Sequence, residues 1–83
     1  MSELSTLPNI GKSIEEKLNA AEIFSAGQLK ELGSKDAFIR IRLKDPDACI
    51  NMLCAIEGAI EGVRWHHLTD EKKAELQAFY STL

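Results

Sequence analysis

One stretch of this chain constrains its fold more than any other, because it is apolar almost all the way round when wound as a helix. Its polar side chains form only a narrow strip that includes Asn51, Glu57 and Glu61. Apolar residues recur there with helical spacing, at Cys49, Leu53, Ile56, Ile60 and Val63. A helix with so little polar surface is buried on most sides. The sequence therefore predicts a central helix over residues 46–61.

The remaining helices follow from local start and stop signals. Side chains that favour helix starts, and glycines that favour helix ends, divide the 83 residues into five short segments. The predicted starts are at Ser13, Ser25, Ser34, Asp45-Pro46 and Thr69, and the predicted ends include Gly33 and Gly62. A chain of this length forms one small domain. We expect residues 1–83 to form a single, compact, all-α bundle of five helices.

The segment Phe38–Lys44 is ambiguous, because apolar and basic residues alternate along it with the period of a strand. No second convincing strand is available for pairing, and an isolated strand is unstable. We therefore predict a helix, with Ala37, Phe38, Ile41 and part of Leu43 facing the core.

The net charge of −3 excludes a domain that binds nucleic acid through an overall basic excess. The charge is uneven, however. Residues 34–44 carry four basic side chains and one acidic one, whereas residues 45–63 carry four acidic side chains and no lysine or arginine. Either these are two solvated faces, or the surface is dipolar and orients a partner.

The cysteines and the termini give the expected cellular context. Cys49 and Cys54 cannot bridge each other on one helix, and we interpret both as reduced core residues. The N-terminal residues lack an apolar targeting segment, and the longest uncharged apolar stretch, residues 48–56, is too short to span a bilayer. We expect a cytoplasmic protein that does not bind membranes.

Sequence motifs for catalysis are missing. The chain has neither a Gly-x-Ser-x-Gly elbow nor a glycine-rich phosphate loop. The adjacent pair His66-His67 lacks the spacing of a metal site. We predict no enzyme activity, no cofactor, no metal and no small-molecule substrate.

The turn at residues 7–13, Leu-Pro-Asn-Ile-Gly-Lys-Ser, resembles the hairpin of a degenerate helix-hairpin-helix motif, with Asn9 in place of the usual first glycine. In that family, backbone N–H groups at the hairpin hold a DNA phosphate, as a helix start can. The candidate phosphate contacts are Asn9, Gly11, Lys12, Ser13, Arg40 and Arg42. The alternative is a turn that simply packs Leu7 and Ile10 into the core.

The order of residues from about 5 to 80 resembles the C-terminal domain of the TfoX (Sxy) competence regulators. The resemblance rests on residues 7–11, on Ala26-Gly27-x-Leu29, and most specifically on Glu57-Gly58-Ala59, Gly62, Trp65 and Leu68. It implies an all-α, five-helix fold of the SAM-like or helix-hairpin-helix-like kind. It also implies structural roles for Gly58, Gly62, Trp65 and Leu68, and no catalytic residues.

The same resemblance implies a role in regulating competence for DNA uptake. In the longer family members this domain follows an N-terminal TfoX domain, for which we expect no room in this chain. We predict a non-enzymatic regulatory module with a protein partner, either a regulator or a second copy in a homodimer. The alternative is weak, sequence-nonspecific binding of nucleic-acid phosphate through the hairpin-like turn.

Overall fold

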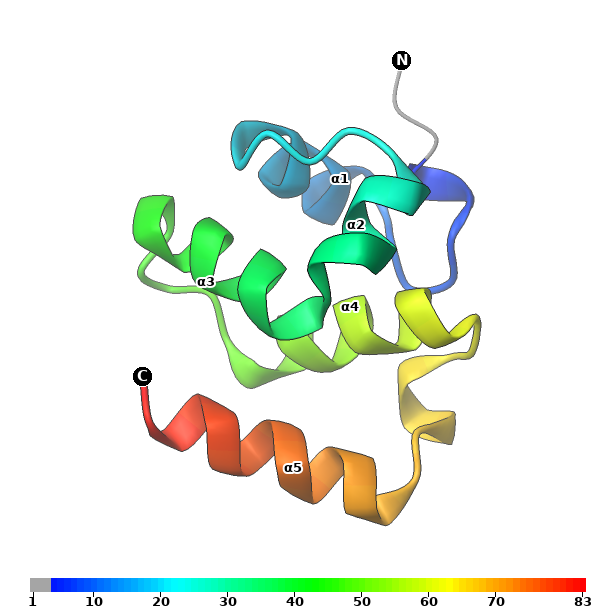
Figure 1. The fold of residues 1–83 in the computed structure, drawn as a ribbon, viewed down its shortest axis with the longest axis vertical. Coiled ribbons are helices and arrows are strands. Elements are labelled where there is room, and N and C mark those ends of the chain that lie inside the picture. The colour runs from blue at the N-terminus through cyan, green and yellow to red at the C-terminus, as the bar shows by residue number, and fades with distance from the viewer. Residues whose placement is uncertain (1–3) are drawn as a thin grey trace.

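The computed structural model describes residues 4–83, which form five α-helices, two short 3₁₀ helices and, within that range, no strand (Figure 1). In chain order the elements are η1 (Leu4–Thr6), α1 (Lys12–Ala20), α2 (Ala26–Leu32), α3 (Ser34–Lys44), α4 (Ile50–Glu61), η2 (Trp65–His67) and α5 (Asp70–Ser81). The predicted all-α, five-helix fold is confirmed. None of these helices is long and apolar enough to cross a membrane.

The central position of α4 is also confirmed. Figure 1 shows α4 across the middle of the molecule, with α5 on one side and α2 and α3 on the other. Leu53, Ile56 and Ala59 of this helix are fully buried. The core is built round α4 because its apolar surface can be covered only by neighbours on several sides.

The start of α4 differs from the prediction, since the helix does not begin at Pro46. The Asp45 carbonyl accepts a hydrogen bond from the Ala48 N–H at 3.0 Å, and the Asp45 carboxylate accepts one from the N–H two residues on at 3.2 Å. An aspartate turn of this kind competes with helix formation at the same residues. As a result, α4 begins only at Ile50.

The delayed start of α4 also corrects the interpretation of one cysteine. Cys49 precedes the helix and is exposed, whereas Cys54 is buried within it. Burial raises the pKa of the Cys54 thiol, because removing a charge from water is unfavourable. Only Cys54 is therefore the core cysteine that the sequence predicts.

The ambiguous segment is helical, as predicted, and α3 buries Ala37, Phe38 and Ile41. The prediction for Leu43 is wrong, because this side chain is 80% exposed. Two residues along a helix are separated by about 200° round the axis. Leu43 therefore points away from the face on which Ile41 is buried.

Two predicted helix caps are confirmed. The Ser25 hydroxyl accepts a hydrogen bond from the Gln28 N–H, and the Thr69 hydroxyl accepts one from the Lys72 N–H, both at 3.1 Å. Each satisfies an N–H group that has no partner within its helix. The predicted helix ends at Gly33 and Gly62 are confirmed as well.

Two other predicted caps are wrong. Gly11 is the residue before α1, so Ser13 lies inside the first turn of that helix. Ser34 is the first residue of α3, and its buried hydroxyl donates to the Glu57 carboxylate at 2.5 Å. A tertiary hydrogen bond to α4 has replaced the local one that Ser34 was expected to make.

Candidate functional site

The hairpin-like turn is fastened to the end of α4 by the side chain of Asn9. Its amide nitrogen donates to the Val63 carbonyl at 2.9 Å and to the Ala55 carbonyl at 3.4 Å. Its amide oxygen accepts from the Trp65 N–H at 3.1 Å. Asn9 also adopts a positive φ of 68°, which asparagine tolerates better than most residues. Its polar side-chain atoms are therefore used inside the fold rather than presented to a phosphate.

Gly58 of α4 allows this close contact. A Cβ atom there would lie 2.5 Å from the Asn9 amide nitrogen and 2.8 Å from the Val63 carbonyl oxygen. Both distances are too short for a carbon atom, so only glycine fits without a rearrangement. We name the contacts among Asn9, Gly58, Val63 and Trp65 the hairpin junction.

The other family-pattern residues lie close to this junction. Gly62 ends α4 with a left-handed φ of 77°, and Leu68 is buried. Trp65 keeps 45% of its surface exposed, and it stacks edge-on with His66 at 5.6 Å between ring centroids. The most specific part of the resemblance thus rests on residues at this end of the molecule.

The structure confirms the packing interpretation of the turn, whereas the phosphate interpretation stays a prediction. Ile10 is buried and Leu7 packs against the core, as expected of a turn with a packing role. Gly11, Lys12 and Ser13 are exposed together at the N-terminus of α1. Their position leaves the start of α1 accessible to an anion.

Arg64 is a basic residue near the turn that the sequence reasoning missed. It lines the same open hollow of about 580 Å³ as residues 6–11. No local motif could have indicated it, because the hairpin junction brings residue 64 to the turn. An acidic side chain lies in the same region, since the Glu15 carboxylate accepts from the Ser5 N–H at 3.2 Å.

Arg40 and Arg42 do not join the other candidate phosphate contacts. Figure 1 shows the C-terminal half of α3 on the opposite side of the molecule from the turn before α1. The Arg42 guanidinium lies 5.4 Å from the centre of the Tyr80 ring and donates to the Ala48 carbonyl at 3.5 Å. The six predicted residues therefore divide into two separate groups.

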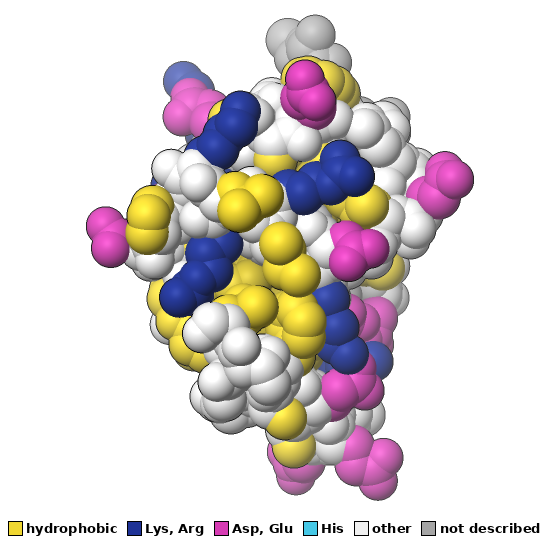
Figure 2. Space-filling view, turned by 60° about the vertical axis from the view of Figure 1, so that its left-hand side comes forward, with side chains coloured by type: hydrophobic (Ala, Val, Ile, Leu, Met, Phe, Trp, Pro, Cys, Tyr) yellow, Lys and Arg dark blue, Asp and Glu magenta, His cyan; other side chains and the backbone are white. Residues whose placement is uncertain are grey.

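The side of the molecule that carries Arg42 has an exposed apolar hollow. Figure 2 shows hydrophobic side chains gathered there, with Lys and Arg side chains on either side. The hollow has a volume of about 290 Å³ and is lined by Ile39, Arg42, Leu43 and Leu83. The three apolar side chains are 36%, 80% and 45% exposed, respectively. We name this surface the α3–α5 hollow.

Arg42 lines this hollow, and Arg40 and Lys44 line a second hollow that shares Leu43 with it. The cations of α3 are only partly neutralised. Lys35 pairs with Glu75 of α5 at 2.8 Å. Among residues 4–83, by contrast, no carboxylate forms an ion pair with Arg40, Arg42 or Lys44. The Lys44 ammonium group instead donates to the Ala20 carbonyl at 2.8 Å. The hollow therefore combines accessible apolar surface with excess positive charge.

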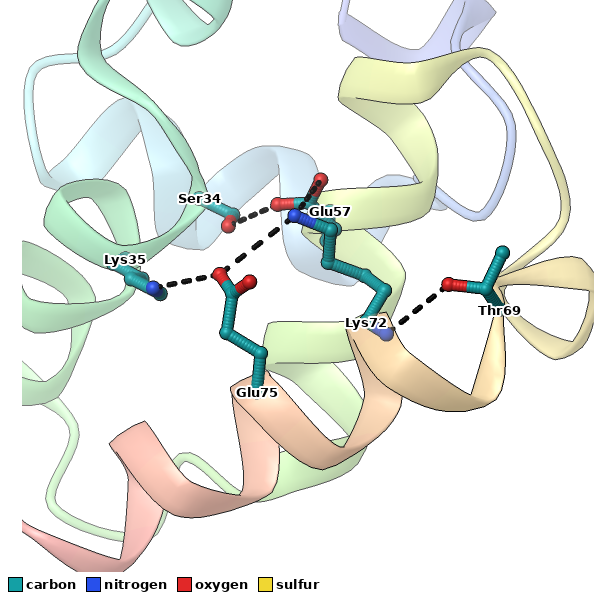
Figure 3. A network of polar contacts seen from close by, with 6 residues as sticks. All are labelled: Ser34, Lys35, Glu57, Thr69, Lys72 and Glu75. Atoms are coloured by element: carbon teal, nitrogen blue, oxygen red, sulfur yellow. Dashed lines mark hydrogen bonds and ion pairs between the residues drawn. The ribbon is translucent and has the colours of Figure 1, made fainter.

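A polar network joins α3, α4 and α5 on a neighbouring surface (Figure 3). Ser34 donates to Glu57, and the Lys72 ammonium group lies 4.0 Å from the Glu57 carboxylate and 3.7 Å from the Glu75 carboxylate. Lys35 approaches Glu75 from α3. The network crosslinks three helices through side chains that each contact a partner.

Opposing effects set the pKa values in this network. Burial disfavours the charged form of Glu57, but hydrogen bonds from Glu61 and Ser34, together with Lys72, outweigh it and lower its pKa. The hydrogen bond with Glu57 raises the pKa of Glu61. Hydrogen bonding to Lys35 lowers the pKa of Glu75.

The polar network does not form a catalytic arrangement. Ser34 is buried, whereas a nucleophilic serine needs access to substrate. The two histidines lie in η2, where their ring centroids are 4.6 Å apart. The network therefore links α3, α4 and α5 to one another.

Comparison with known proteins places this five-helix domain in a family. The TfoX C-terminal domain matches residues 1–80, and the chain belongs to this family. A comparison with curated proteins finds no match.

Two crystal structures from Listeria monocytogenes are close to this chain in both sequence and fold. The tetragonal form of a protein of unknown function has 48% identity and a TM-score of 0.95, with 96% of this chain and 98% of that chain covered. The triclinic form of an uncharacterized protein has 48% identity and a TM-score of 0.94, with 95% and 90% covered.

Proposed function

We propose that this domain is a non-enzymatic regulatory module that acts in the cytoplasm by binding another protein, in the manner of a competence regulator. The observation that carries the proposal is the α3–α5 hollow. Leu43, its most exposed apolar residue, packs against little of its own chain. Apolar side chains gathered at a hollow are typical of interaction surfaces. Membership of the TfoX C-terminal domain family supports a regulatory role.

Site-specific photocrosslinking tests this function directly. A benzophenone amino acid replaces Leu43 in one variant and Lys12, the first residue of α1, in a matched control. Each variant is irradiated in a cell extract, and its adducts are identified by mass spectrometry. We expect discrete protein adducts from position 43 and none of the same adducts from position 12. Position 43 is mostly exposed, so the probe does not disturb the core.

The nature of the adducts decides between the outcomes. A defined protein partner, or a second copy of this chain, at position 43 supports the proposal. Irradiation that yields no protein adduct from position 43 overturns it.

Nucleic-acid binding is the second candidate function, and the position of Arg64 favours it. Arg64 and Gly11 line one open hollow, and the exposed residues Lys12 and Ser13 follow Gly11 in the chain. A cation beside a helix N-terminus suits a phosphate group. This candidate uses neither Arg40 nor Arg42, because both belong to the C-terminal half of α3, which lies across the molecule from the turn before α1 (Figure 1).

Titration of a fluorescent DNA duplex at low and moderate salt tests the second candidate. Binding through phosphates weakens steeply as salt rises, and Lys12→Glu should weaken it equally for all sequences. Arg40→Glu is the matched control and should leave binding unchanged. Failure to bind at low salt would rule out this function.

A further inference from the structure

We infer that the α3–α5 hollow binds an acidic amphipathic helix of a partner protein. This inference rests on the proposed protein-binding function and names the chemical class of its partner. Three observations support it: the apolar lining of the hollow, the unpaired cations around it, and its position between two helices.

The apolar lining of the hollow is suited to a large apolar side chain of the partner. Ile39 and Leu43 come from α3 and Leu83 follows α5, so two segments distant in sequence form one concave apolar surface. A volume of about 290 Å³ accommodates one or two large side chains. A partner that inserts a leucine or phenylalanine would remove these exposed residues from water, which is the main favourable contribution at such contacts.

The cations around the hollow indicate an acidic partner. Arg40, Arg42 and Lys44 have no ion-pair partner among the described residues, although the chain as a whole is acidic. Carboxylates flanking the anchor would face these side chains. Complementary charge of this kind increases the association rate and selects against basic partners. A two-fold contact between two copies would instead bring the same cations together.

The surrounding fold favours a helix as the bound element. Residues 4–83 contain no strand, so they present no sheet edge to which an extended peptide could add. The neighbouring elements α3 and α5 are helices, and a groove beside helices is typically filled by an amphipathic helix with anchors three or four residues apart. A nucleic-acid backbone would leave Ile39, Leu43 and Leu83 exposed.

Two synthetic peptides provide the test. Both are stapled helices of about 16 residues with one leucine-rich face, and they differ only in whether glutamate or lysine flanks that face. Binding is measured by fluorescence anisotropy and mapped by amide shifts in the ¹⁵N-labelled domain. We expect the glutamate peptide to bind at least about tenfold more tightly than the lysine peptide. The shifted amides should lie near residues 39–43 and 83.

Two variants and one control assign the interaction to the hollow. Leu43→Ser removes an anchor contact and should weaken binding of the glutamate peptide by about tenfold or more. Arg40→Glu reverses an unpaired charge and should weaken it by about fivefold or more. Lys12→Glu makes the same charge change on the other side of the molecule and should leave binding unchanged. All three positions are exposed, and circular dichroism verifies that the variants fold.

The outcomes separate this inference from the proposed function. Equal binding of the two peptides, or no binding of the glutamate peptide, overturns the acidic-helix inference. Binding of the domain to phosphatidylglycerol vesicles through Leu43, without binding to the glutamate peptide, also overturns it. A protein adduct at position 43 in the crosslinking experiment would then still support the proposed function. Absence of any protein adduct there would remove the proposed function itself.

Discussion

The hairpin junction and the α3–α5 hollow differ in how completely their side chains are packed and paired with polar partners. At the hairpin junction, Asn9 makes three hydrogen bonds to backbone groups, and Gly58 has no room for even a methyl group. At the α3–α5 hollow, Leu43 is mostly exposed and Arg40 has no ion-pair partner among residues 4–83. The residues through which the chain resembles its family hold the fold together. The surface available for binding is formed by other residues.

The largest expected effect on stability comes from a substitution in the central helix, α4. Leu53→Ala should lower the free energy of unfolding by about 2–5 kcal/mol, because it removes a fully buried side chain and leaves a cavity. Leu43→Ala is the matched control in the hollow and should change stability by less than about 0.5 kcal/mol. Urea denaturation measures both. Similar losses for the two variants would contradict the contrast between core and hollow.

Asn9 should show the next largest effect. Asn9→Ala removes three hydrogen bonds and places alanine at a positive φ, so we expect a loss of about 2–4 kcal/mol. Asn9→Gly keeps the backbone conformation accessible and isolates the hydrogen bonds, at about 1–3 kcal/mol. Thermal or urea unfolding compares the two variants. A negligible loss for both would mean that the junction contributes nothing to stability.

A substitution at Gly58 of α4 also tests the hairpin junction. Gly58→Ala adds a carbon atom within 2.5 Å of the Asn9 amide nitrogen and should cost about 1–3 kcal/mol through overpacking. Gly27→Ala, on α2, meets no atom within 4 Å and should stabilise the domain by about 0.5–1 kcal/mol. Equal and favourable effects in urea denaturation would show that Gly58 is not confined.

Acidification should have the smallest effect on the free energy of unfolding. Folding lowers the pKa values of Asp45, Glu57 and Glu75, so the folded state binds fewer protons than the unfolded state at low pH. Their contribution is complete above the ordinary carboxyl values and is lost as the pH falls through the lowered ones. Glu61 acts in the opposite sense, because its pKa is raised: its contribution is complete below its ordinary value of 4.5 and is lost as the pH rises through the raised value.

The urea midpoint, followed from pH 7 to pH 3, measures this dependence. We expect a decline on the acid side, and a shallower decline in Glu57→Gln, which removes one group with a lowered pKa. The same change should return the pKa of Glu61 toward its ordinary value, since its hydrogen bond with Glu57 is the main cause of the shift. An identical pH dependence in both proteins would contradict the assignment.

The structure agrees best with the sequence pattern where the interacting residues are close together in the chain. The caps at Ser25 and Thr69 act through N–H groups three residues away, and the apolar periodicity of α4 is visible within a single segment. These features follow from local hydrogen bonding and from helical geometry. The order of residues therefore predicts both caps and the helix.

The candidate site was predicted less well, because it depends on contacts between distant residues. The sequence shows the basic character of residues 34–44, but it predicts that Arg40 and Arg42 share a phosphate site with Gly11, Lys12 and Ser13. The structure divides that set between two sides of the molecule. The exposure of Leu43 and its proximity to Leu83 depend on how α3 and α5 pack. A periodic pattern that fits both a strand and a helix cannot specify that packing.

By itself, the sequence determined the all-α class, the number of helices, the burial of α4 and the resemblance to the TfoX C-terminal domain. Tertiary structure decided where α4 begins, which partners Asn9 binds, and which apolar residues remain exposed. The first set depends on hydrogen bonds within one turn and on the period of a single helix. The second depends on contacts such as that between Asn9 and Val63, 54 residues apart. Such contacts exist only once the helices have packed together.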